Sequence, residues 1–384
     1  MDIDRGKSMS PDTRGAVNGP IRVMIVDDSA IVRGLITRML QADPGVEVVA
    51  SVNNGDIAVK TLSRDKVDVI ILDIEMPVMD GLTALPLLLK IDPKVKVLIA
   101  STLTAHNADI SLRALRAGAT DYIPKPTTRE ISSGADFRRD LLLKVRALGK
   151  SQRPGAGQAR GPAPAKPVAH VSGVPTVATG ATVPLRKPGV QSADILAVGS
   201  STGGPQALFK FLVGIKPTIN IPILITQHMP PMFTTMLAEH ITRMTEWLAL
   251  EAEDGEVVKA GRIYVAPGGF HMLVEVKGTE KILRLSKGEP ENFCRPAVDP
   301  MLRSVAKAYG GHTLVVMLTG MGYDGNKGSR VIVEAGGTIV AQDEATSVVW
   351  GMPGAVAMGG LCSAVLPLDD IAPHVMAVLA RKPR

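Results

Sequence analysis

The chain has 384 residues, a formal net charge of +6 and only 3% aromatic residues. This length predicts about two to three domains, each large enough to bury a core. No apolar stretch approaches the roughly 18 residues of a membrane span, and the polar N-terminus lacks the apolar segment of a signal peptide. Cys294 and Cys362 are isolated and match neither a metal motif nor a disulfide framework. We therefore expect a cytoplasmic protein without direct membrane insertion.

The excess positive charge lies in one segment, residues 149–190, which holds seven Gly, seven Pro and six basic residues but no acidic residue. These six residues account for the whole net charge of +6, so the rest of the chain is neutral and a basic face for nucleic acid is not indicated. We expect a flexible linker here, because so few apolar residues cannot offset the entropy lost on ordering. Residues 1–20 are equally polar and are expected to form a disordered tail.

Residues 21–148 alternate between strand and helix patterns. Apolar runs predict strands at residues 22–28, 46–52, 67–74, 95–101 and 120–125. Amphipathic stretches predict helices at residues 31–41, 55–65, 82–92, 108–118 and 135–149. Strands that are apolar along their whole length are typical of a parallel sheet covered on both faces. We therefore predict a flavodoxin-like (βα)5 domain of the α/β class.

Polar side chains stand where these strands end. Asp27 and Asp28 end the first strand, Asp73 the third, Ser101 the fourth and Lys125 the fifth. Because the carboxyl ends of parallel strands share one edge of the sheet, we expect all of these side chains to lie together. Three carboxylates repel one another unless a cation neutralises them, and hard oxygen ligands beside a phosphate favour Mg²⁺. A lone aspartate would be explained by helix capping, but the complete set is not.

The segments around these residues closely resemble the receiver domain of two-component response regulators: IVDDSA (25–30), LDIEMPVMDG (72–81), AST (100–102) and YIPKP (122–126). The resemblance covers residues 21–148. It implies that Asp73 accepts a phosphoryl group from a histidine kinase, and that Asp27, Asp28 and Asp73 hold Mg²⁺ for that step. It also implies that Ser101 and Lys125 respond to the phosphate, and that the peptide bond before Pro126 is cis.

A second set of strand patterns follows the linker, at residues 193–201, 221–227, 312–320 and 336–342, with helix-like stretches between them. Residues 262–276 and 281–286 have the pattern of a β-hairpin insert. We therefore predict that residues 191–384 form a doubly wound, mostly parallel-sheet hydrolase domain with that hairpin inserted.

Residues 199–203, Gly-Ser-Ser-Thr-Gly, fit the G-x-S-x-G pattern of a strand-to-helix turn that exposes a serine, here Ser201. The motif by itself is weak. A small-residue turn that only packs a strand against a helix is about as frequent. A phosphate-binding loop is the other alternative, although G-x-x-x-x-G-K-[ST] is absent.

The remaining strand ends strengthen the catalytic interpretation. A serine nucleophile needs a base, best a histidine whose tautomer a carboxylate fixes. His228 and Asp324 each follow a predicted strand, and both are expected at the same edge as Ser201. The chain order Ser, His, Asp argues against the α/β-hydrolase fold, in which the acid precedes the histidine. His271 is the main rival base, and Asp343 is the alternative acid.

Five segments closely resemble the catalytic domain of the CheB family, the protein-glutamate methylesterases of bacterial chemotaxis: SSTGG (200–204), ITQHMPP (225–231), YVAPGG (264–269), LTGMGYDG (318–325) and AQDEATSVVWGMPGAV (341–356). The resemblance implies that Ser201 is the nucleophile, His228 the general base and Asp324 its orienting acid. Thr202 and the backbone of Met321 are the implied oxyanion donors. The implied substrates are methylated glutamates of chemoreceptor cytoplasmic domains. No cofactor is implied for ester hydrolysis, and many family members also deamidate receptor glutamines.

Two other function classes stay open at this point. The C-terminal domain of a response regulator can bind a partner or nucleic acid without catalysis, but no basic recognition helix or zinc spacing supports that version. Reaction with a serine-directed electrophile separates the two, because a binding domain has no uniquely labelled serine. A serine hydrolase for small esters is the third class, and it predicts saturable turnover of free esters.

Overall fold

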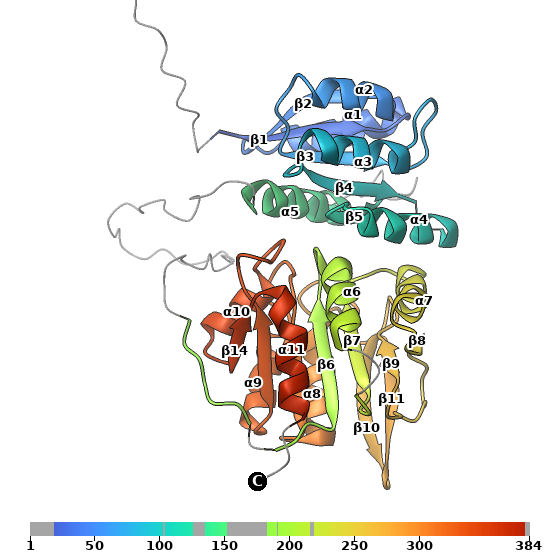
Figure 1. Cartoon of the computed structure of the whole chain (residues 1–384). Helices are drawn as coiled ribbons and strands as arrows, with labels where there is room; N and C mark the ends of the chain where they lie inside the picture. The colour runs from blue at the N-terminus through green and yellow to red at the C-terminus, as the bar shows by residue number, and fades with distance from the viewer. Residues whose placement is uncertain are drawn as a thin grey trace, which may run out of the picture.

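The computed structural model describes residues 19–102, 104–125, 135–151, 183–189, 191–215 and 219–380. They form two α/β domains, and Figure 1 shows the N-terminal domain lying across one end of the C-terminal domain. The expectations for most of the tail, for most of the linker and for the bond before Pro126 lie outside the described residues. Within the described ranges, no helix combines the length and the apolar character that a membrane crossing requires.

The N-terminal domain is a five-stranded parallel sheet in the order β2-β1-β3-β4-β5. Its strands are β1 (Ile21–Val26), β2 (Val46–Val52), β3 (Val69–Asp73), β4 (Lys96–Ser101) and β5 (Asp121–Pro124). Its helices are α1 (Ala30–Gln41), α2 (Gly55–Leu62), α3 (Gly81–Ile91), α4 (Ala105–Arg116) and α5 (Ala135–Ser151). This arrangement confirms the flavodoxin-like prediction.

Local capping starts these helices directly after the strand ends. The side chains of Ser29, Asn54, Asp80 and Thr104 each accept a hydrogen bond from the N–H three residues later. All five residues of β3 are buried, as expected for a central strand covered on both faces. Asp73 is the last residue of that strand, so the apolar core holds its backbone at the edge of the sheet.

The C-terminal domain is built on a seven-stranded parallel sheet in the order β14-β13-β12-β6-β7-β9-β8. Its strands are β6 (Ile195–Ser200), β7 (Ile223–Gln227), β8 (Ala249–Glu251), β9 (Ile263–Val265), β12 (Thr313–Met317), β13 (Thr338–Gln342) and β14 (Ala364–Leu366). An antiparallel hairpin stands apart from this sheet, formed by β10 (His271–Lys277) and β11 (Glu280–Ser286). The helices are α6 (Gly204–Ile215), α7 (Phe233–Thr245), α8 (Val298–Tyr309), α9 (Asn326–Glu334), α10 (Met352–Met358) and α11 (Leu368–Leu379). The predicted class and the hairpin insert are confirmed.

One detail of the predicted insert is wrong. The sequence pattern joined residues 262–276 in one element, but β9 belongs to the main sheet beside β7, and only β10 begins the hairpin. The turn between them contains Gly269 with φ +85°, a conformation that redirects the chain and that glycine adopts without strain. Because the residues on both sides of the turn are apolar, the hydrophobic pattern shows no break between β9 and β10.

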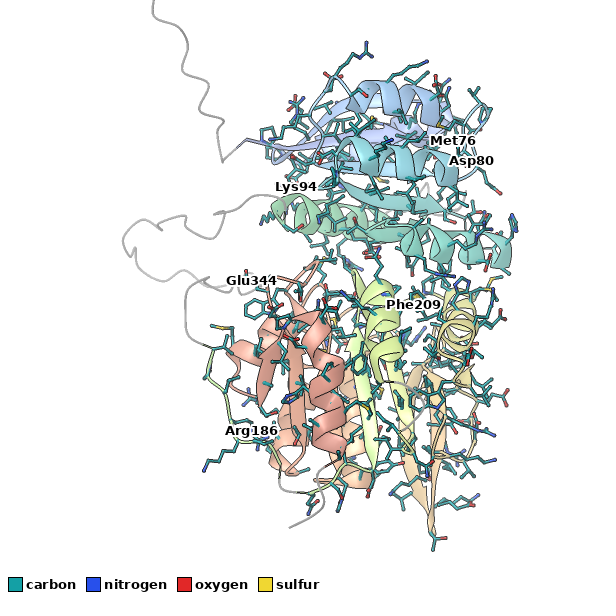
Figure 2. The ribbon with its side chains drawn as sticks, viewed as in Figure 1. Met76, Asp80, Lys94, Arg186, Phe209 and Glu344 are labelled. Atoms are coloured by element: carbon teal, nitrogen blue, oxygen red, sulfur yellow. The ribbon has the colours of Figure 1, made fainter. Side chains whose placement is uncertain are left out.

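Residues 183–189 lie against the C-terminal domain, although composition placed them within the linker. The backbone N–H of Arg186 donates to the carbonyl of Cys362 at 2.9 Å, and its guanidinium donates to the carbonyl of Gly337 at 2.9 Å. The N–H of Gly189 donates to the Thr338 hydroxyl at 2.8 Å. Figure 2 shows Arg186 on the flank of the domain, well away from the N-terminal domain. The amino-acid composition of the segment does not reveal such hydrogen bonds.

Polar contacts join the two domains at α4. The side-chain amide of Gln206, on α6, donates to the carbonyl oxygen of Leu115 at 2.7 Å and to that of Ala119. The Leu115 carbonyl lies in the last turn of α4, and the Ala119 carbonyl lies in the loop that follows this helix. The ring nitrogen Nε2 of His240, on α7, lies 2.8 Å from Oδ1 of Asp109 on α4. Figure 1 shows α4 and α5 facing α6 and α7.

Aromatic rings form the apolar part of the same boundary. Tyr122, on β5, stacks on Phe233 at the start of α7, with ring centroids 4.5 Å apart and planes inclined by 13°. Both rings are almost fully buried. Phe209 of α6 lies nearby, at the end of the C-terminal domain that faces the other domain (Figure 2). The two domains therefore share one continuous apolar cluster.

Candidate active site

The strand ends of the N-terminal domain bring the predicted acidic residues together. Ligand atoms of Asp27, Asp28 and Asp73 lie within 4.8 Å of one another. Asp27 and Asp73 are buried and Asp28 is exposed. The ammonium of Lys125 bridges the two buried carboxylates, at 2.8 Å from Asp27 Oδ2 and 2.7 Å from Asp73 Oδ2. Three carboxylates with this spacing are a donor set that suits a hard cation such as Mg²⁺.

Burial and ion pairing act in opposite directions on the pKa values at this edge. It raises the pKa of Asp73 to about 6, because the hydrogen bond and charge of Lys125 offset only part of the desolvation. Burial alone would lower the pKa of Lys125, but its hydrogen bonds to Asp27 and Asp73 raise it above the ordinary value. Because Asp27 and Asp73 hold the Lys125 ammonium, a second cation or an added phosphoryl group at these carboxylates would change its position.

Ser101 lies at the same edge, but its hydroxyl forms its hydrogen bonds away from Asp73. Its buried hydroxyl lies 3.4 Å from the carbonyl oxygens of Thr102 and Asn107, so it is directed toward the start of α4. Gly81 is a residue of this site that the sequence analysis missed. A Cβ at Gly81 would lie 2.1 Å from the carbonyl oxygen of Asp73, so only glycine lets α3 begin this close to the acceptor.

The second site is a cavity of about 520 Å³ at the carboxyl ends of β6, β7 and β12. All five residues that the sequence analysis assigned to hydrolysis line it: Ser201, Thr202, His228, Met321 and Asp324. The position agrees with the general rule that parallel sheets bind ligands beyond their carboxyl ends.

The N-terminal domain closes the other side of this cavity. Lys125, which bridges Asp27 and Asp73, lines the cavity together with Phe137, Arg139 and Lys144 of α5. The guanidinium of Arg139 lies 4.6 Å from the ring centroid of Phe293, on the rim contributed by the C-terminal domain. Side chains of both candidate sites therefore face one shared space.

His228 and Asp324 are in direct contact. Nε2 of His228 lies 2.8 Å from Oδ2 of Asp324, and the two side chains are 11% and 2% exposed. The other ring nitrogen, Nδ1, lies 3.4 Å from the sulfur of Cys294. The half-buried hydroxyl of Ser201 has no hydrogen-bond partner among the described residues, so the nucleophile shares the cavity without yet contacting the imidazole. Such contacts are often long in unliganded enzymes.

The neighbouring Ser200 is held in a structural role. It is fully buried and donates to Oε1 of Gln227 at 2.6 Å. The amide nitrogen of Gln227 donates to the carbonyl of Ser201 at 2.9 Å, which fixes the turn that presents Ser201. A Cβ at Gly204 would lie 2.1 Å from the same Oε1, so the close approach of α6 requires glycine. Gln227 is a second residue that the sequence analysis missed.

The rival residues lie elsewhere. Both ring nitrogens of His271 contact backbone: Nε2 lies 3.0 Å from the carbonyl of Glu289, and Nδ1 lies 3.2 Å from the N–H of Ala297. The carboxylate of Asp343 accepts from the N–H and the hydroxyl of Thr346, at 3.0 and 2.6 Å. Neither His271 nor Asp343 lines the cavity.

Asp324 lies against the first turn of α8. Its carboxylate accepts from the N–H groups of Val298 at 2.6 Å, Asp299 at 3.1 Å and Gly325 at 2.9 Å. Burial alone would raise the pKa of Asp324, but the hydrogen bond and charge of His228, together with these N–H groups, hold it below the ordinary value. The carboxylate is therefore ionised at neutral pH and faces the imidazole.

Thr202 supplies a hydroxyl with no competing partner. Its side chain is 1% exposed, its Oγ1 has no hydrogen-bond partner among the described residues, and the residue lines the cavity. A buried polar group that protein atoms leave unpaired is a candidate contact for a ligand. A developing oxyanion next to Ser201 would provide that contact.

The environment of His228 predicts a shifted pH profile. Burial lowers the pKa of the ring, but the contact with the Cys294 sulfur and the hydrogen bond and charge of Asp324 outweigh burial and raise it. Because the neutral ring is the base, removing the sulfur in Cys294→Ala should lower this pKa and extend activity to lower pH. We expect the acidic limb of kcat/KM to move down by roughly 0.5–1 pH unit. The control is Cys362→Ala, whose buried thiol lies outside the cavity; an unmoved limb in Cys294→Ala would contradict the prediction.

Comparisons with known proteins identify the family of each domain. Residues 23–132 match the response regulator receiver domain family and residues 196–375 match the CheB methylesterase family. A protein-glutamate methylesterase/protein-glutamine glutaminase of Paramagnetospirillum magneticum is 57% identical over 97% of this chain and 100% of that protein. A Rhodospirillum rubrum protein of the same name is 55% identical, over 96% and 97%.

Among solved structures, the chain is similar to the crystallised CheB methylesterase catalytic domain of Thermotoga maritima. The two are 40% identical, with a TM-score of 0.48, over 49% of this chain and 100% of that one. Identity above half along almost the entire chain establishes the family. The chain belongs to the CheB family of protein-glutamate methylesterases that carry a receiver domain.

Proposed function

We propose that this chain hydrolyses glutamate γ-methyl esters on chemoreceptor cytoplasmic domains, with Ser201 as nucleophile, His228 as general base and Asp324 as the acid that orients it. The observation that carries the proposal is the 2.8 Å contact between His228 and an ionised Asp324, in the cavity that Ser201 also lines. The family names of the relatives give the substrate class.

The contacts of the two ring nitrogens support separate tasks for them. Nε2 of His228 is engaged by Asp324, so Nδ1, which lies 3.4 Å from the Cys294 sulfur, is the nitrogen that takes the proton from Ser201 as its oxygen attacks the ester carbonyl. The tetrahedral oxyanion is stabilised by the Thr202 hydroxyl and by the backbone N–H of Met321. The imidazolium then donates its proton to the departing methanol, and water attacks the acyl-enzyme with the same histidine as base. Glutamine amides follow the same steps with ammonia as the leaving group.

The receiver domain regulates access to this cavity. Asp73 accepts the phosphoryl group of a histidine kinase, and Asp27, Asp28 and Asp73 would hold Mg²⁺. That ion, when bound, neutralises the carboxylates and the incoming phosphoryl oxygens. Lys125 supports a direct connection between the two sites, because it pairs with Asp73 and also lines the catalytic cavity. Phosphorylation draws Ser101 toward Asp73 and engages Lys125, already paired with Asp73, with the phosphoryl oxygens. This weakens the contacts by which the N-terminal domain closes the catalytic cavity.

Asp73→Asn should keep the basal rate of ester hydrolysis but lose its stimulation by a small phosphodonor with Mg²⁺, because the amide cannot be phosphorylated. A shortened chain that begins at Val183 keeps the segment bonded to the C-terminal domain. It should be about tenfold more active than the unphosphorylated full chain. This ratio corresponds to a free energy of about 1.4 kcal/mol for closure of the cavity by the N-terminal domain.

Both variants are measured by methanol release from methyl-labelled receptors, with and without the phosphodonor. Free small esters serve as the comparison substrate, since turnover limited to them would favour the small-ester hydrolase. If the shortened chain is folded yet slower than the full chain, the receiver activates or targets the enzyme and does not inhibit it.

A further inference from the structure

A strained turn borders the catalytic cavity. Glu291 and Cys294 exchange two backbone hydrogen bonds, at 3.1 and 2.9 Å, and enclose Asn292 and Phe293. Both enclosed residues have positive φ, at 52° and 65°. This is the pattern of a type I′ turn, which asparagine tolerates but a bulky residue such as phenylalanine rarely adopts. Backbone strain of this kind is retained where it places a side chain that the site needs.

Asn292 is the side chain that this turn directs at the catalytic acid. Its amide nitrogen lies 2.8 Å from Oδ1 of Asp324 and 3.0 Å from Oδ2 of Asp299. A primary amide has two N–H donors, so each carboxylate receives one. Asp299 and Asp324 are 0% and 1% exposed, so water cannot replace the amide as a hydrogen-bond donor to these carboxylates.

The carboxylates of Asp299 and Asp324 meet in a buried space, and the Asn292 amide donates to both of them. Burial raises the pKa of Asp299, and the charge and side-chain contact of Asp324 raise it further, whereas the N–H of Gly328 and the amide of Asn292 lower it. Two buried carboxylates in contact tend to share a proton. A proton shared in this way would reduce the negative charge that Asp324 presents to His228.

We propose that Asn292 is a positioning residue for ester hydrolysis: its amide donates to both Asp299 and Asp324, which stabilises the two neighbouring carboxylates as anions and leaves Asp324 a full carboxylate toward His228. This inference rests on the role of Asp324 in the proposed function. Asn292 acts through Asp324 and does not touch the reacting ester.

The test uses the full-length protein with methyl-labelled receptors. Asn292→Gly preserves the positive φ and removes only the amide, so it should lower kcat by roughly 10–100-fold with little change in KM. Asp299→Asn removes the second carboxylate and keeps an oxygen for the N–H of Gly328. The double variant should therefore be at least tenfold more active than Asn292→Gly.

A purely structural role predicts the opposite for the double variant, which would then be no faster than Asn292→Gly. That result, or a normal kcat in Asn292→Gly, would overturn the inference. If melting curves show that Asn292→Gly is unfolded, Asn292→Asp decides, because it has the same size and also tolerates positive φ. It should lose at least as much activity, and Asp299→Asn should again restore part of it.

Asp324→Asn separates this inference from the function on which it rests. A severe loss in Asp324→Asn with normal Asn292 variants would remove only the role of Asn292. Normal activity in Asp324→Asn would instead remove the assignment of the catalytic acid.

Discussion

Ser201→Ala should lower methanol release by on the order of 10⁴–10⁶-fold, because it removes the hydroxyl on which the acyl-enzyme forms. The serine is half-buried on a turn, and its hydroxyl has no hydrogen-bond partner among the described residues, so its removal should leave the fold intact. Release of labelled methanol gives the rate, and a melting curve verifies folding. A serine-directed electrophile should label the parent chain once, at Ser201, and should leave the variant unlabelled.

Ser200→Ala is the matched control, one residue away in the same turn. It deletes a buried hydrogen bond and leaves Oε1 of Gln227 without its donor, which should lower the free energy of unfolding by about 1–3 kcal/mol. The folded fraction should still turn over methylated receptor. If Ser200 proves essential while Ser201→Ala stays active, the nucleophile has been assigned to the wrong serine.

His228→Gln should reduce turnover by on the order of 10⁴-fold or more, because glutamine cannot accept the proton of Ser201. The matched substitution is His271→Gln. His271 contacts only backbone through its ring nitrogens, so its loss should appear in the melting temperature and far less in the rate. Initial rates on methyl-labelled receptors, corrected for the folded fraction, compare the two. Equal rate losses would indicate that His271 takes part in the chemistry.

Strand ends made both sites predictable from the sequence. A parallel sheet forces Asp27, Asp73 and Lys125 to one edge, and the same geometry gathers His228 and Asp324 beside the Ser201 turn. The strands β8 and β14 were not predicted, because three residues are too few to show a periodicity. Their positions follow from pairing with neighbouring strands and not from their own composition.

Other features depend on contacts that no local pattern encodes. Asn292 meets Asp324 across 32 positions of the chain, through a turn whose backbone conformation is unusual for its second residue. Cys294 looked like an isolated thiol in the sequence, yet its sulfur lies next to the imidazole of His228. The packing of α4 against α6 and α7 could not be predicted from the sequence either, because Gln206 and His240 have the pattern of ordinary polar residues on amphipathic helices.

The stacked rings of Tyr122 and Phe233 also affect how substrate and signal combine. The two buried rings stack on each other across the domain boundary, so separation of the domains would expose apolar surface at this boundary. A receptor that binds only the separated form shifts the equilibrium toward that form by mass action, by RT ln(1 + [L]/Kd). Under the proposed function, methylated receptor would therefore be a second input to the equilibrium between joined and separated domains, beside phosphorylation. We expect the degree of phosphorylation needed for half-maximal activity to fall as the concentration of methylated receptor rises.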